Sequence, residues 1–179
     1  MITLVALLLQ AAAPAPAAVA PWTVSTRPKT DPTITSTVTS GSSADGNAKL
    51  VVRCDAGKAN VVSVQLFSRT ALGGPPARPV SLTFDANTPM IDNWEFVQQG
   101  AFQRDDVAVT TLTTALAAAK TIKLHTTTAT GEPVDASFTG PASAAPVTSV
   151  LAACGYTLGQ PPVRAPDPKD AKKGKKDAQ

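Results

Sequence analysis

Leu50-Val51-Val52-Arg53-Cys54-Asp55 is an alternating stretch that ends beside one of only two cysteines in this 179-residue chain. Successive side chains of a strand point to opposite faces, so Leu50, Val52 and Cys54 share one face and Arg53 lies on the other. This pattern is typical of a strand that covers a core. We expect the stretch to decide the fold, because Cys54 can tie it to the far end of the domain.

Similar alternation recurs along the chain, separated by turns rich in Gly, Pro and Asn. We expect further strands over residues 22–26, 33–39, 60–67, 79–85, 93–97, 122–125 and 134–139. The strand at 50–54 should form a hairpin with 60–67, and the strand that begins at 122 should form another with 134–139. Both tryptophans, Trp22 and Trp94, are expected in the core.

Two segments carry helical spacing instead. Val109, Leu112 and Leu116 follow Asp105-Asp106, a pair of acidic residues that suits a helix N-terminus. Pro146 can open a second short helix that ends at Gly155. The sequence therefore predicts a mainly β (α+β) fold: an antiparallel β-sandwich-like domain with two short helices.

Composition and charge limit the function. Apolar residues make up 43% of the chain but aromatic residues only 4%, which predicts one domain with a modest aliphatic core. Residues 21–160 hold ten basic and ten acidic residues, so the whole net charge of +3 comes from residues 161–179. A neutral domain does not have the basic face of a nucleic-acid binder, and we expect no nucleic-acid partner.

The two ends of the chain differ from its middle. Residues 1–20 hold an apolar octet followed by Ala and Pro, with no charged side chain, which resembles a secretory signal peptide and is too short to span a bilayer. A disordered start is the alternative. Residues 161–179 are rich in Pro and Lys, and we expect them to form a disordered tail. The predicted folded domain is therefore 21–160, exported to the periplasm and without a membrane span.

Export permits disulfides, and two cysteines allow a single intramolecular pair. We expect Cys54 to pair with Cys154, and the alternative is two separate buried thiols. Two cysteines and one distant histidine lack the spacing of a zinc site, so we expect no metal and no other cofactor.

No catalytic constellation is evident, and we expect no catalytic residues. The one histidine, His125, falls on the solvent face of its predicted strand. The carboxylate pairs Asp105/Asp106 and Asp92/Glu95 have plainer explanations, as a helix cap and as residues that border a strand.

Several short motifs recur in an order that resembles a known family. They are WTVST (22–26), LVVRC (50–54), VSLTFD (80–85), Trp94, GEPVDASF (131–138) and AACGY (152–156). The order is similar to that of the periplasmic accessory proteins associated with type VI secretion, the VasI/TagO type. Tyr156 stands where that family tends to have Trp. The resemblance supports export and the Cys54–Cys154 disulfide, implies an accessory or binding role, and carries over no catalytic residue.

We therefore expect a non-enzymatic periplasmic accessory or binding protein, whose partner is a protein of the envelope or of a secretion machine. Arg53 is a candidate contact residue, and its alternative role is to pair with a carboxylate within the sheet. Two other functions stay open: a periplasmic inhibitor or immunity-type protein, and an envelope-polymer binder that uses the basic tail.

Overall fold

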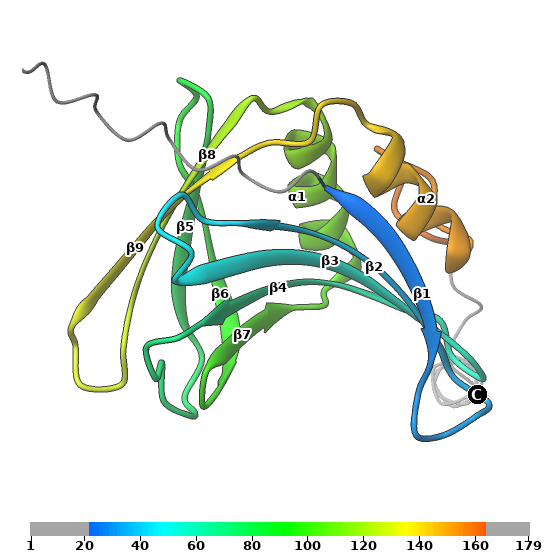
Figure 1. The fold of residues 1–179 in the computed structure, drawn as a ribbon, viewed down its shortest axis with the longest axis horizontal. Coiled ribbons are helices and arrows are strands. Elements are labelled where there is room, and N and C mark those ends of the chain that lie inside the picture. The colour runs from blue at the N-terminus through cyan, green and yellow to red at the C-terminus, as the bar shows by residue number, and fades with distance from the viewer. Residues whose placement is uncertain (1–21, 164–179) are drawn as a thin grey trace, which may run out of the picture.

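The fold is one antiparallel sheet of nine strands with two helices on one side (Figure 1). A computed structural model describes residues 22–163, and the predicted signal peptide and the chain from residue 164 onward lie outside the described residues. The elements in chain order are β1 Thr23–Pro28, β2 Thr35–Ser42, β3 Ala48–Ala56, β4 Val61–Ser68, β5 Arg78–Phe84, β6 Met90–Val97, β7 Gly100–Gln103, α1 Asp106–Ala118, β8 Thr121–Thr127, β9 Pro133–Thr139 and α2 Ala145–Ala153. Among the described residues, no helix is long and apolar enough to cross a membrane.

The strand order is β1-β2-β3-β4-β7-β6-β5-β8-β9, and the sheet bends at β6. The first part of β6 pairs with β5, as far as Trp94 opposite Arg78, while its last residues, from Glu95 onward, pair with β7. Strands on either side of this bend run in crossed directions in Figure 1. The bend gives one sheet the two facing halves of a sandwich-like fold.

The core lies between these halves and under the helices. Alternate residues of β3 and β4 point into it, with Leu50 opposite Leu66 and Val52 opposite Val64, all fully buried. Trp94 and Phe96 enter from β6, and Leu116 enters from α1. Both tryptophans are buried, as predicted, with 7% of Trp22 and 1% of Trp94 exposed.

The main sequence predictions are confirmed. The fold is mainly β with two helices, and both predicted hairpins form, with Cys54 opposite Val62 in the first and Leu124 opposite Ala136 in the second. Asp105 caps α1 by accepting hydrogen bonds from the amides of Val107 and Ala108 at 3.1 and 3.0 Å.

One strand was not predicted. β7 is only four residues long and includes Gly100 and Gln103, so its sequence has no run of alternating β-branched residues that could reveal it. Its pairing explains why it forms. It fills the space between β4 and the end of β6, and Ala101 is buried opposite Leu66.

Candidate functional site

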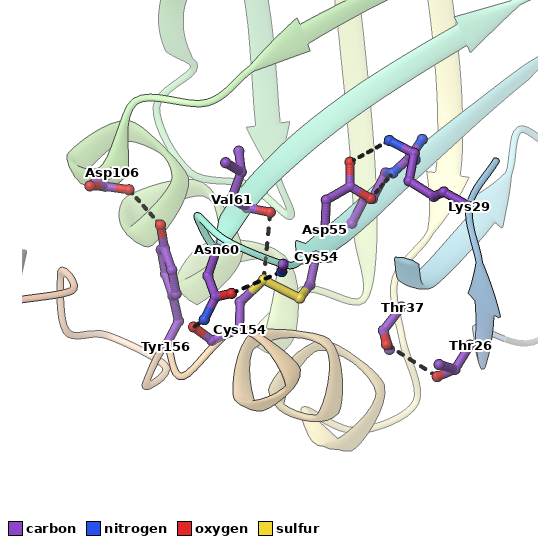
Figure 2. Close-up of a disulfide and its surroundings, with 12 residues drawn as sticks. Thr26, Lys29, Thr37, Cys54, Asp55, Asn60, Val61, Asp106, Cys154 and Tyr156 are labelled. Carbon is purple, nitrogen blue, oxygen red and sulfur yellow. Dashed lines mark hydrogen bonds and ion pairs between the residues drawn. A yellow bond between two sulfur atoms is a disulfide. The ribbon is translucent and has the colours of Figure 1, made fainter. Parts of the chain in front are cut away.

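The disulfide predicted from the sequence is present and serves as scaffold (Figure 2). Cys54 points inward from β3, and Cys154 ends α2, with their Cα atoms 5.7 Å apart. Side chains next to the disulfide reinforce the same junction. The Asn60 amide donates to the carbonyl of Cys154 at 3.1 Å, and the Tyr156 hydroxyl donates to Asp106 at 2.7 Å. The bridge and both hydrogen bonds hold the end of α2 against β3, β4 and α1.

Arg53 takes the alternative role considered for it. Its Nε donates to Asp55 at 2.8 Å, and Lys29 reaches the other oxygen of the same carboxylate at 3.1 Å. Partial burial by itself would raise the pKa of Asp55, but hydrogen bonds from Arg53, Lys29 and Ser36 outweigh it and hold the pKa below its ordinary value. Asp55 thus engages Arg53 within the sheet, and Arg53 is not the centre of the site proposed below.

His125 lies on the solvent face of β8, as predicted, and has neighbours that the sequence did not reveal. Its Nδ1 is 2.8 Å from an Asp135 oxygen, and Ser81 of β5 is its cross-strand neighbour on the other side. Ser81, His125 and Asp135 thus form a row across three strands, and they are the residue types of a hydrolase triad. However, β5 and β8 are interior strands whose amides are paired within the sheet, so neither strand offers free N–H groups beside Ser81 to stabilise an oxyanion.

The candidate carboxylates are each engaged. Asp92 accepts a hydrogen bond from the Gln103 amide, and Glu95 pairs with Arg104 at 2.9 Å. The structure brings Asp92 and Asp105, which the sequence did not pair, to one shallow groove between β6 and α1. Its other walls are mostly apolar, and Asp105 is already committed to capping α1.

A further candidate surface is the face of β2, β3, β4 and β7 that points away from the helices, which we call the outer face. The helices contact the opposite face, through α2 on β2 and β3 and α1 on β4, and Figure 1 shows no element over the outer face. Strand alternation places Phe67 of β4 there, opposite Gly100, and places Val97 of β6 opposite Gly100 on its other side. Phe67 is 44% exposed and Val97 is 53% exposed.

A cleft of about 570 Å³ opens at the end of this face, bounded by the β2–β3 turn, the end of β4 and the β6–β7 turn. Main-chain hydrogen bonds hold its rim together: Arg69 N–H donates to the Asn47 carbonyl at 2.8 Å, and Ser68 N–H donates to the Gln99 carbonyl at 2.9 Å. Phe67 lines the cleft. The volume lies within the range of ordinary ligand pockets.

The cleft is cationic in a neutral domain. Lys49 and Arg69 both line it, no carboxylate does, and neither cation has an ion-pair partner among the described residues. The nearby Asp45 turns away to the β2–β3 turn, where the Ser43 hydroxyl, the Asn47 amide N–H and the Asn47 side chain hydrogen-bond to it and lower its pKa. An exposed aromatic ring beside two cations that lack an ion-pair partner within residues 22–163 can bind an apolar side chain next to a carboxylate.

Comparisons of the chain with protein-family models, curated proteins and solved structures found no match. The function proposed below is therefore inferred from the geometry of the outer face and the cleft.

Sequence reasoning missed the cleft because its third wall, Gln99 in the β6–β7 turn, is brought beside the predicted β3–β4 hairpin only by the unpredicted β7. One signal was available. Alternation that turns Val62, Val64 and Leu66 inward leaves Phe67, a large aromatic residue, on the polar face.

Proposed function

We propose that this chain is an exported, non-enzymatic accessory protein of the cell envelope that binds another protein through the outer face. The observation that carries the proposal is the exposed pair Phe67 and Val97 beside a cleft lined by Lys49 and Arg69. Exposed aromatic residues among polar and basic side chains are typical of interaction sites, because the ring supplies burial and the charges supply orientation.

The chemistry of the face defines the partner. Lys49 and Arg69, which have no carboxylate partner in the described part of the chain, attract an acidic segment, and the Phe67 ring favours one that also carries an apolar side chain. The sequence resemblance to VasI/TagO-type proteins leads us to propose that this partner is a component of the type VI secretion machine in the periplasm. Under this proposal the disulfide and the Asn60 and Tyr156 hydrogen bonds keep the sheet rigid behind the binding face.

Photo-crosslinking in cells tests the proposal. A photoreactive amino acid at Phe67 should cross-link one envelope protein, whereas the same amino acid at Lys123, exposed on the other half of the sheet, should not. Lys49→Glu with Arg69→Glu should weaken the cross-link from Phe67 at least about tenfold, and Lys123→Glu should leave it unchanged. Equal cross-linking from both positions would contradict a role for the outer face.

The identity of the cross-linked protein separates the open functions. A secretion-machine component supports the accessory role. An exported toxic enzyme would instead support the inhibitor or immunity function. Retention on purified peptidoglycan that disappears when residues 161–179 are deleted would support the polymer binder.

A further inference from the structure

The two edge strands of the sheet differ in how far neighbouring residues cover them. The C-terminal half of β9 is covered, because the Ala44 amide donates to the Ser137 carbonyl at 2.9 Å and the Trp22 indole donates to the Thr139 carbonyl at 2.8 Å. β1, at the opposite edge, pairs only with β2, and each of its six side chains is exposed. Natural proteins shield sheet edges with charged side chains, Pro, bulges or covering loops. Within the described residues, β1 carries Arg27 and Pro28 near its end, and no bulge interrupts its pairing with β2. Thr23–Thr26 has neither a charged side chain nor a Pro.

The register shows which groups of β1 are free. Lys29 N–H donates to the Ile34 carbonyl at 2.9 Å, at the closed end of the β1–β2 hairpin. In an antiparallel pair, hydrogen-bonded positions alternate, so Arg27, Ser25 and Thr23 bond to β2. Val24, Thr26 and Pro28 therefore turn their main-chain groups to the open edge. Pro28, which has no N–H, falls at an edge-facing position, where proline costs the sheet no hydrogen bond.

We propose that β1 pairs antiparallel with β1 of a second copy of this chain, about a twofold axis at Ser25. In this register Val24 of each copy lies opposite Thr26 of the other copy. The free N–H and carbonyl groups of both residues then all find partners, giving four main-chain hydrogen bonds between the copies. The exposed Val24 side chain, 41% accessible, is covered at the same time.

Charge favours a second copy as the occupant. The domain has zero net charge over residues 21–160, so two copies do not repel each other. Arg27 is the one charged residue of β1, and the proposed register places it opposite Thr23 rather than opposite another Arg27. The pairing joins two nine-stranded sheets into one and leaves the outer face open on both copies, so it does not depend on the function proposed above.

Molar mass in solution tests the pairing with the full chain, purified with its disulfide oxidised. The mass measured by light scattering should double as concentration rises. Val24→Pro removes an edge-facing N–H and no β2 hydrogen bond, so it should raise the dimer dissociation constant at least about tenfold. Val24→Ala keeps that N–H and is the matched control. Circular dichroism checks that the variants fold, and Thr26→Pro removes the other free donor.

Cross-linking tests the register independently. Opposed residues at a non-hydrogen-bonded position lie about 4.5 Å apart at Cα, which a disulfide can span. Ser25→Cys should therefore form an intermolecular disulfide under mild oxidation, whereas Lys123→Cys, exposed elsewhere, should not. A monomer at every concentration, a dimer that Val24→Pro leaves unchanged, or equal cross-linking at both cysteines would overturn the proposal.

Discussion

The indole nitrogen of Trp22 donates a hydrogen bond at 2.8 Å to the carbonyl of Thr139, 117 residues later in the chain. This contact joins the residue before β1 to the end of β9, the two outermost strands of the sheet. The ring packs on Gly41 of β2, where an added Cβ would lie 2.6 Å from two of its atoms. Trp22, which needs a glycine beneath its ring, thus helps to close the bent sheet at one end, together with the main-chain hydrogen bond from Ala44 to Ser137.

Gly41→Ala should therefore lower the free energy of unfolding by about 1–3 kcal/mol, because the new methyl group forces the Trp22 ring to move. Denaturant titration followed by tryptophan fluorescence measures the loss. Gly74→Ala is the matched control, because a Cβ at Gly74 meets no atom within 4 Å. Equal stability of the two variants would show that Trp22 can move at no cost.

Reduction of the disulfide should destabilise the protein strongly. The bond closes a loop with a sequence separation of 100 residues, and the chain-entropy model assigns such a loop about 4–5 kcal/mol. The double variant Cys54→Ala with Cys154→Ala should show the same loss without a reductant. The measurement is the denaturation midpoint of the oxidised protein, the reduced protein and the double variant. A midpoint that stays unchanged on reduction would mean that Asn60, Tyr156 and the core hold α2 without the bridge.

Arg78 should be as important for stability as a core residue. Its guanidinium donates to the carbonyls of Leu72 at 2.7 Å and Gly74 at 2.9 Å, and lies 3.8 Å from the centre of the Phe96 ring. Arg78→Lys keeps the charge but cannot donate to several carbonyls at once, so we expect a loss of about 1–3 kcal/mol. Arg69→Lys, a change at a cation of the cleft, should leave stability within about 0.5 kcal/mol. Thermal unfolding of the two variants compares them directly.

The sequence predicted the fold where a local pattern was enough. Alternation revealed Leu50 to Cys54 and its hairpin partner, and the cap at Asp105 marked the start of α1. A local sequence pattern could not reveal the pairing of β7 with β4, the Ser81–His125–Asp135 row or the cleft. Each of these depends on the strand order, which brings distant segments together. Arg78 illustrates the same limit, since alternation says nothing about the loop carbonyls that it binds.

Asp85 should make stability depend on pH. It adopts a φ of 55°, which Asp and Asn tolerate better than most residues, and its Oδ1 accepts hydrogen bonds from the amides of Thr121 at 2.8 Å and Lys120 at 3.0 Å. These hydrogen bonds, with that of Thr121 the strongest, lower the pKa of Asp85. A carboxylate whose pKa is lower in the folded state stabilises the protein above its unfolded pKa of about 4, and this contribution is lost as the pH falls through the folded pKa.

Asp85→Asn separates charge from backbone geometry. Asparagine tolerates the same φ, and its amide oxygen can accept the same two hydrogen bonds, but it does not titrate. The variant should be less stable than the parent protein at pH 7, and the difference should shrink as the pH falls below about 4. Denaturant midpoints from pH 7 to pH 2.5 measure it. A constant gap between the Asp85→Asn and parent curves would show that the Asp85 charge contributes nothing.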